Sequence, residues 1–274
     1  MASLPDGSLP IGVFDSGVGG LTVLAALEAA LPGERFLYLG DTARLPYGTK
    51  SPASVARYAS QCAGALVARG IKLLVVACNT AASAALPALA RQFPSLPVIG
   101  VVEPGAAAAV AATRSGHIAV IATEGTIRAG AYQAAIGALS SDVRVTALSG
   151  SLFVALAEEG WTEGPIVELA ARRYLDATFA QPLPPDTLLL GCTHFPVLGR
   201  ALAGVLPAGV TLVDSAATTA RAVAQLLAQR GLASPLAVGA TNFLATDGPE
   251  RFARVGSIFL GRPLLAAEVE LVDV

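Results

Sequence analysis

Two cysteines occupy matching positions in this sequence, each at the end of an apolar run. Cys78 follows LLVVA and precedes NTAAS, whereas Cys192 follows LLLG and precedes Thr193 and His194. An apolar run followed by polar residues predicts a buried strand that gives way to a helix or turn. Free amide N–H groups and the positive end of a helix dipole at such a junction stabilise a thiolate or a bound carboxylate. Cys78 alone is equally well explained as a small buried residue.

Taken together, the two cysteines favour proton transfer at a carbon atom. Two equivalent thiols that face each other suit a reaction that removes a proton from one face of a carbon and delivers one to the other, as in a racemase or epimerase. His194 could hold or relay a proton for a neighbouring thiol, although a lone histidine is more often structural. Cys62 shares a helical face with Val55, Ala59 and Leu66, which assigns it to the core.

The elements that must position these thiols alternate between short apolar runs and longer helical patterns. Apolar residues recur at spacings of three and four in 53–69 and 166–179, which predicts helices. The runs that predict strands are Ile11–Phe14, Phe36–Leu39, Leu73–Ala77, Val98–Val101, Ile118–Ile121, Val143–Ala147, Thr187–Leu190 and Thr211–Val213. This alternation predicts an α/β fold with mostly parallel sheet and helices on both faces.

A weak internal repeat divides these strands into two sets. IGVFDSG at 11–17 resembles IAVIATEG at 118–125, and LVVACNTA at 74–81 resembles LLLGCTHF at 188–195, at offsets of 107 and 114 residues. Any two buried strands look alike, which is the alternative explanation. We favour two similar parallel-sheet α/β domains that face each other across a central cleft, because ligands bind at the carboxyl ends of parallel strands.

The predicted division assigns one cysteine to each domain. The first domain comprises residues 1–103 plus 215–274 and carries Cys78, and the second comprises residues 104–214 and carries Cys192.

Two polar loops are expected to border the cleft. DSGVGGLTVL (15–24) follows the first predicted strand but matches neither the P-loop nor the GxGxxG spacing, so a nucleotide site is a weak hypothesis. The segment instead predicts a loop that brings backbone N–H groups and the carboxylate of Asp15 close to a small ligand. DTARLPYGTKS (41–51) is a second such loop, kinked by Pro46 and Gly48.

Composition excludes several classes of protein. Of 274 residues, 54% are hydrophobic and 14% charged, which favours a folded chain. A net charge of −2 with only two lysines, Lys50 and Lys72, argues against binding of nucleic acid or of an anionic membrane. Neither lysine lies in a context that suits a Schiff base, so we expect no pyridoxal. Three scattered cysteines and two histidines, without CxxC or HxxxH, predict neither disulfides nor a metal site.

The same sequence predicts a cytoplasmic protein. The longest uncharged stretch, 73–90, contains Pro87 and changes from a Val/Leu run to an Ala-rich pattern, so a strand, a turn and a helix describe it better than a membrane span. The N-terminal residues lack a basic start followed by an apolar stretch, so no signal peptide is expected.

Beyond these patterns, the chain resembles the glutamate racemases of the aspartate/glutamate racemase family over nearly its whole length. The segments that carry the resemblance are IGVFDSGVGGLTVL, YLGDTARLPYGTKS, VVACNTAAS, PVIGVVEPGA, LLLGCTHFPVL and TDGPERF. The resemblance implies a two-domain α/β protein, commonly a homodimer, that interconverts L- and D-glutamate without a cofactor and supplies D-glutamate for peptidoglycan synthesis.

The resemblance also implies roles for particular residues. Cys78 and Cys192 are implied as the acid–base thiols, with Asp15 beside the first thiol and His194 assisting the second. Glu158 is similar to the glutamate of a helix motif near the second thiol, although ALAEEG stands here where a proline-containing version is common. The residues implied to bind substrate are Asp15, Ser16, Tyr47, Gly48, Asn79, Thr80, Thr193 and His194.

Three other functions compete with this interpretation. An aspartate racemase would use the same two-thiol logic on a shorter substrate. A catalytically silent relative could act as a regulatory protein that binds DNA gyrase. A thiol hydrolase or amidase would use Cys192 and His194 alone, which leaves Cys78 unexplained.

Overall fold

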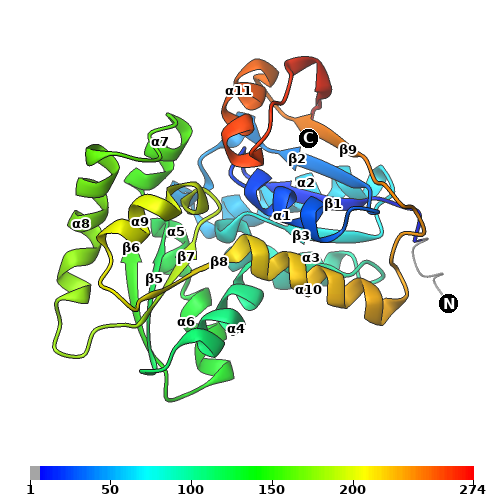
Figure 1. Ribbon diagram of the computed structural model, residues 1–274. Helices are drawn as coiled ribbons and strands as arrows, with labels where there is room; N and C mark the ends of the chain where they lie inside the picture. The colour runs from blue at the N-terminus through cyan, green and yellow to red at the C-terminus, as the bar shows by residue number, and fades with distance from the viewer. Residues whose placement is uncertain (1–6) are drawn as a thin grey trace.

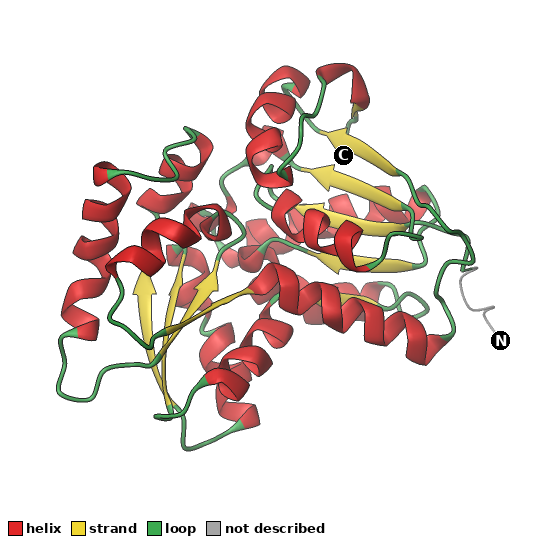
Figure 2. Ribbon diagram, in the orientation of Figure 1, coloured by secondary structure: helices red, strands yellow, loops and turns green. Residues whose placement is uncertain are grey.

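The computed structural model describes residues 7–274, which form two parallel β-sheets with helices on both faces (Figure 1, Figure 2). The six-stranded sheet has, in spatial order, β10 (Val269–Leu271), β9 (Thr241–Ala245), β2 (Phe36–Gly40), β1 (Ile11–Asp15), β3 (Leu73–Val76) and β4 (Val98–Gly100). The four-stranded sheet has β6 (Arg144–Ser149), β5 (His117–Ala122), β7 (Thr187–Gly191) and β8 (Thr211–Asp214). The predicted α/β fold with two similar parallel sheets is therefore confirmed.

The two sheets share one strand order, which explains the internal repeat. The order β2-β1-β3-β4 in the larger sheet matches β6-β5-β7-β8 in the smaller. The paired segments of the repeat form β1 and β5, and the cysteine segments follow β3 and β7. In the larger sheet, β2 lies on one side of β1 and β3 lies on the other, so the strand order reverses between β1 and β3. In the smaller sheet, β6 and β7 flank β5 in the same way, and the order reverses between β5 and β7. Such switch points are where parallel α/β sheets bind ligands.

Eleven α-helices cover the two sheets within residues 7–274. They are α1 (Leu21–Ala30), α2 (Pro52–Ala68), α3 (Asn79–Gln92), α4 (Val102–Ala112), α5 (Glu124–Ala129), α6 (Ala131–Leu139), α7 (Leu152–Glu158), α8 (Pro165–Phe179), α9 (Gly199–Val205), α10 (Ser215–Arg230) and α11 (Pro249–Leu260). Short 3₁₀ turns occupy Thr42–Arg44, Tyr47–Thr49, Phe195–Leu198 and Ala266–Glu268. The capping chemistry is local: Ser51 caps α2, which opens with a proline, and the carboxylate of Asp214 accepts N–H groups from the first turn of α10.

All eight predicted strands are present, with ends that differ by one or two residues. The helices predicted over 53–69 and 166–179 are α2 and α8, and 73–90 is β3 followed by α3. Strands β9 and β10 were not predicted, because neither forms an apolar run of four residues: β9 (TNFLA) opens with two polar residues, and β10 (VEL) is an edge strand of three residues with a glutamate at its centre. No helix within the described residues is long and apolar enough to cross a membrane.

The core lies between the sheets and their helices. Strands β1, β2, β3, β5 and β7 are buried throughout, as expected for parallel strands covered on both faces. Cys62 on α2 is fully buried, so its predicted place in the core is confirmed. Lys72, before β3, is also fully buried and forms an ion pair with Glu34.

The predicted domain boundaries fall at identifiable places in the chain. The boundary after residue 103 falls inside α4, and residue 215 begins α10, which packs against both α1 and α4. After α10 the chain returns to the larger sheet as β9 and β10 (Figure 1). Residues 1–6 of the predicted first domain lie outside the described residues. The division itself stays a prediction.

Candidate active site

A cavity of about 300 Å³ opens where the carboxyl ends of strands from the two sheets meet. The volume lies at the lower end of small-molecule sites, which span roughly 300–1,000 Å³. Every predicted site residue except Asp15 lines it. The lining residues are Ser16, Leu45, Pro46, Tyr47, Gly48, Thr49, Cys78, Asn79, Thr80, Thr123, Ser151, Val154, Ala155, Glu158, Cys192, Thr193 and His194. Both thiols of the sequence repeat therefore reach one cavity, from opposite sheets.

Cys78 sits at the junction that its sequence predicts, between β3 and α3. Its sulfur accepts a hydrogen bond from the N–H of Ala81 at 3.4 Å as the N-cap of α3, and its thiol lies 3.4 Å from the hydroxyl oxygen of Ser16. The residue is only 5% exposed. Burial, together with the nearby carboxyl of Asp15, raises the pKa of Cys78 to about 12. Cys78 is therefore a thiol at neutral pH.

Asp15 ends β1 directly behind this thiol and is completely buried. Its Oδ2 accepts a hydrogen bond from the N–H of Gly17 at 2.9 Å. Burial raises the pKa of the Asp15 carboxyl, against the opposing effects of His194 and of the surrounding backbone N–H groups. Asp15 is not among the residues that line the cavity, and its expected contact with substrate stays a prediction.

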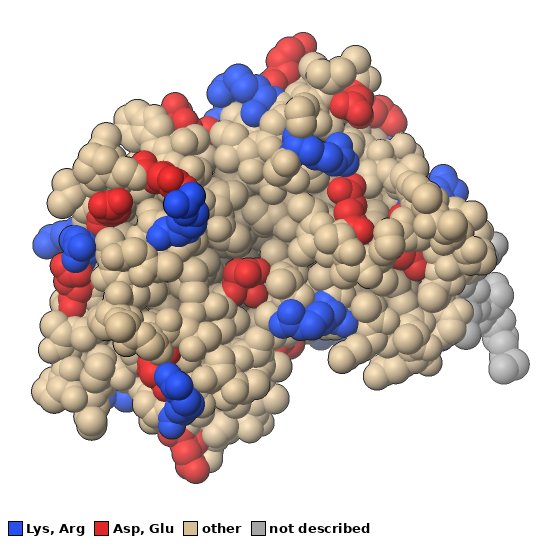
Figure 3. Space-filling model, viewed as in Figure 1, with Lys and Arg blue, Asp and Glu red and all other residues tan. Residues whose placement is uncertain are grey.

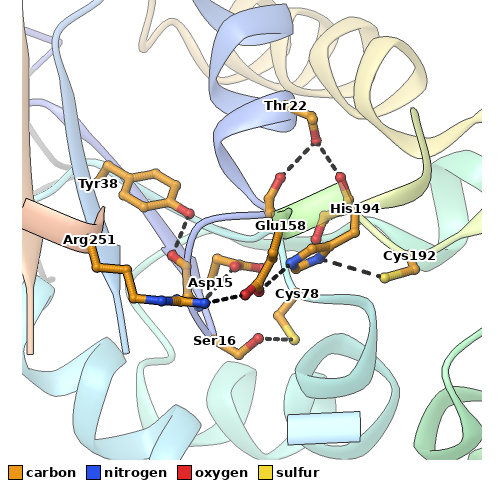
Figure 4. A network of polar contacts seen from close by, with 12 residues as sticks. Asp15, Ser16, Thr22, Tyr38, Cys78, Glu158, Cys192, His194 and Arg251 are labelled. Carbon is orange, nitrogen blue, oxygen red and sulfur yellow. Dashed lines mark hydrogen bonds and ion pairs between the residues drawn. The ribbon is translucent and has the colours of Figure 1, made fainter. Parts of the chain in front are cut away.

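The second thiol belongs to a chain of polar contacts, visible in Figure 4. Cys192 follows β7, is 6% exposed, and its sulfur lies 3.9 Å from Nδ1 of His194. The other ring nitrogen of His194 lies 3.1 Å from Oε1 of Glu158 at the end of α7. Arg251 on α11 donates a hydrogen bond of 2.8 Å to Oε2 of the same glutamate. The predicted association of His194 and Glu158 with the second thiol is thus present in the geometry.

These contacts set the charges of the chain. Burial alone would lower the pKa of His194, but the contacts with Cys192 and Glu158 outweigh it and raise the pKa to about 10. Burial would raise the pKa of Glu158, but its hydrogen bonds to His194 and Arg251 lower it to about 2. At neutral pH the cavity therefore holds an imidazolium beside Cys192 and a neutral thiol at Cys78.

The glycine-rich loop after β1 exists to let the two halves approach. A Cβ atom built on Gly19 would lie 2.3 Å from Nδ1 of His194 and 2.5 Å from Oγ1 of Thr193. The hydroxyl of Thr22 lies 2.9 Å from the carbonyl oxygen of Gly19 and 3.0 Å from that of Thr193. The loop therefore packs directly on the turn that carries Cys192. This close packing accounts for Gly19, whereas a Cβ atom on Gly20 would instead lie 2.5 Å from Cβ of Asp15.

The second predicted loop presents Tyr47 and Gly48 to the cavity. The phenol of Tyr47 donates its hydrogen bond to the buried carboxylate of Asp41, which also accepts from Arg44 at 2.7 Å and from Thr246 at 3.0 Å. Burial, with Cys62 and Asp41 nearby, raises the pKa of Tyr47 well above its ordinary value. The hydroxyl of Tyr47 is therefore engaged away from the cavity and serves neither as acid nor as base.

The sequence analysis missed several polar residues at the site. Thr123, which precedes α5, lines the cavity and lies 3.0 Å from the hydroxyl of Thr80. The hydroxyl of Tyr132 on α6 donates to Oδ1 of Asn79 at 2.6 Å, which ties the two sheets together beside the cavity. Thr123 was signalled by the repeat, since it occupies the place after β5 that Ser16 occupies after β1.

Charge is scarce around the cavity. Among residues 7–274, no lysine or arginine lines it, and Glu158 is the only carboxylate that does. Lysine, arginine, aspartate and glutamate side chains are scattered over the face in Figure 3 without forming a patch of one sign. No cluster of three or more metal-ligating side chains occurs among residues 7–274. A bound anion would therefore be held by hydroxyl, amide and backbone N–H donors, with the imidazolium of His194 as the one cation among the described lining residues.

Two facing parallel sheets that each deliver one thiol to a small cavity define an isomerase that moves a proton between the two faces of a carbon atom. A model of the Asp/Glu/Hydantoin racemase family matches residues 11–223. The chain belongs to this family.

Individual relatives agree with this assignment. The glutamate racemase of Geobacter metallireducens is 52% identical over 255 residues, which cover 93% of each chain. A crystal structure of glutamate racemase from Thermus thermophilus in complex with beta-chloro-D-alanine is 46% identical, with a TM-score of 0.88 over 98% of each chain. Glutamate racemase from Francisella tularensis in complex with D-glutamate is 35% identical, with a TM-score of 0.89 over 97% of this chain and 98% of that one.

Proposed function

We propose that this protein is a glutamate racemase that interconverts L- and D-glutamate and supplies D-glutamate for peptidoglycan synthesis. The observation that carries the proposal is that Cys78 and Cys192, from different sheets, line one cavity. The substrate comes from the relatives, since proteins 46% and 52% identical over nearly the whole chain bear the name glutamate racemase. Hydrolysis by Cys192 and His194 alone is not favoured, because it gives the second cavity thiol no role.

In the proposed mechanism the two sulfurs act as base and acid in turn. The thiolate of one cysteine takes the α-proton, so that an S–H bond forms and the C–H bond breaks with its electron pair left on the carbon. The thiol of the other cysteine then gives its proton to the opposite face of that carbon. We assign the resting negative charge to Cys192, which lies beside the imidazolium of His194, and the resting proton to Cys78. Each turnover exchanges the two roles, and the reverse reaction starts from the exchanged state.

Stabilisation of the developing carbanion falls to neutral donors. The α-carboxylate would accept hydrogen bonds around the first turn of α3 and from the hydroxyls of Ser16 and Thr193, which line the cavity together with Asn79 and Thr80. One donor of this kind is worth about 3 kcal/mol where charge develops. We place the side-chain carboxylate of the substrate near Gly48, whose loop closes the same cavity. Asp15, buried behind Cys78, acts on that thiol.

Exchange of the α-proton with deuterated solvent tests the assignment of the two thiols. In Cys78→Ala, racemisation should stop while the remaining thiolate still exchanges the α-proton of one enantiomer. In Cys192→Ala, exchange should persist for the other enantiomer only. Cys62→Ala removes a thiol outside the cavity and should leave racemisation intact. Undiminished racemisation by either cavity variant would refute the two-thiol mechanism.

The choice of glutamate over aspartate is testable on the same protein. In separate incubations with L-glutamate and with L-aspartate, the circular dichroism signal of glutamate should decay to zero, whereas that of aspartate should persist. Racemisation of aspartate at the greater rate would assign the enzyme to the shorter substrate.

We further propose that the protein is a homodimer in the cytoplasm, which the resemblance to glutamate racemases supports. Light scattering coupled to size exclusion should give a mass about twice the 27.5 kDa of one chain.

A further inference from the structure

Helix α11, which does not line the cavity, contacts both Glu158 and His194, the two residues next to Cys192 in the chain of polar contacts. Arg251, in its first turn, donates the 2.8 Å hydrogen bond to Glu158, and Phe259, two turns later, packs edge-on against the ring of His194 with 4.9 Å between ring centres. Glu158 belongs to α7 on the smaller sheet, whereas α11 packs against α1 on the larger sheet. The contact between Arg251 and Glu158 thus joins the two halves of the molecule.

The two oxygens of Glu158 are divided between two partners. Oε1 faces His194 at 3.1 Å and Oε2 accepts from Arg251. Glu158 is the last residue of a seven-residue helix, so its backbone alone fixes its side chain weakly. Its side chain is 15% exposed, and two partners at opposite oxygens hold the plane of the carboxylate. Because Glu158 binds one ring nitrogen of His194, that contact turns the other nitrogen toward Cys192.

We propose that Arg251 is a positioning residue for the reaction: it holds Glu158 in place, and Glu158 in turn orients His194 toward the sulfur of Cys192. This inference rests on the proposed racemase function, in which Cys192 exchanges a proton with substrate. Arg251 lies C-terminal to residues 11–223, which the family model matches, and within TDGPERF at 246–252.

Removal of Arg251 should change the pKa of His194 in opposite directions, depending on whether Arg251 acts through its charge or by holding Glu158 in position. The direction of this change therefore tests the proposal. The ionisable groups that face His194 are Cys192 on its own turn, Glu158 from α7 and Asp15 from the end of β1. Loss of a nearby cation acting only through its charge would favour the imidazolium and raise the pKa of His194. Release of Glu158 from its position would remove a hydrogen-bond partner of the imidazolium and lower the pKa of His194.

The experiment is an NMR titration of the histidine rings, which is simple because the chain has only His117 and His194. In Arg251→Ala the pKa of His194 should fall from about 10 toward its ordinary value of 6.5, while His117 is unchanged. Arg251→Lys should restore part of the difference. Arg254→Ala, which removes an exposed arginine from the same helix, should change neither histidine. Arg251 is 49% exposed, so its truncation leaves no buried cavity, and Arg251→Gln provides the same comparison should the alanine variant fail to fold.

Kinetics complete the test. Arg251→Ala should reduce kcat by about ten- to a hundredfold, the usual cost of losing a partner that orients a functional group, with KM little changed. An unchanged or raised pKa of His194 in Arg251→Ala would overturn the proposal. Because the titration needs no substrate, it separates this inference from the proposed function. A wild-type protein without glutamate racemisation would refute the function, whereas the titration alone decides the role of Arg251.

Discussion

Substitution of Gly19 by alanine tests whether close contact between the two halves sets the position of His194. The backbone at Gly19 does not adopt a positive φ, so alanine meets no conformational penalty and only the available space is changed. The new Cβ would lie 2.3 Å from Nδ1 of His194 and 2.5 Å from Oγ1 of Thr193, whereas ordinary contact begins at 3.4 Å. The loop or the imidazole must therefore move by about 1 Å, and a displacement of this size at a reacting group costs on the order of 10²-fold in rate.

The assay is the initial rate of racemisation of each enantiomer, followed by circular dichroism. We expect kcat/KM of Gly19→Ala to fall on the order of 10²-fold. The overpacking should also lower the free energy of unfolding by about 1–3 kcal/mol. L- and D-glutamate have equal free energies, so kcat/KM must fall by the same factor in both directions, which checks the data internally.

A matched control separates the contact from the loss of a glycine. Gly137 lies on α6 with no heavy atom within 4 Å of a built Cβ, so Gly137→Ala should keep full activity and gain up to about 1 kcal/mol of stability. Full activity in a folded Gly19→Ala protein would refute the argument that this contact positions His194.

Three further predictions concern the buried polar groups. Tyr47→Phe should lower the free energy of unfolding by about 1–3 kcal/mol, because Oδ2 of the buried Asp41 loses one of its two hydrogen-bond donors and keeps only Arg44. KM should change little, since the hydroxyl of Tyr47 points away from the cavity; urea unfolding and steady-state kinetics check the two expectations. Lys72→Met should cost about 3–5 kcal/mol by leaving the charge of Glu34 buried without its cation, and Lys72→Met with Glu34→Leu should recover most of it in the same unfolding assay. The folded-state pKa of His194 is about 10, above its unfolded value of 6.5, so its stabilisation is complete below about pH 6.5 and is lost as pH rises through 10. Unfolding measured across this range should show a decline in the wild type that His194→Asn lacks.

The sequence predicted the two cavity thiols because their positions follow from the residues immediately around them. Cys78 and Cys192 each follow a buried strand, and the carboxyl ends of parallel strands share one edge of a sheet. The repeat placed one such edge in each half, so a common cavity followed from pattern alone. Cys62 was separated from them by the same reasoning, because its neighbours at helical spacing are apolar.

The rest of the site depends on contacts between segments far apart in the chain. Arg251 is exposed and follows a turn, and nothing in its local sequence shows that it meets Glu158. The sequence around Asp41 predicts an exposed loop residue. In the structure Asp41 is fully buried, and its carboxylate accepts hydrogen bonds from Tyr47, Arg44 and Thr246. Such partners follow only from how the sheets and loops pack, which neither periodicity nor capping signals encode.

The repeat explains why the two thiols occupy equivalent positions in their sheets, although the residues around them differ. Where β1 ends in Asp15, β5 ends in Ala122, and where Thr80 stands two residues after Cys78, His194 stands two residues after Cys192. A racemase of this kind needs one thiol and one thiolate at the same time, and two identical halves would leave the proton equally shared between the sulfurs. A buried acid behind one sulfur and an imidazolium beside the other remove that degeneracy. The changes that break the repeat are thus the ones that prepare the pair for its first proton transfer.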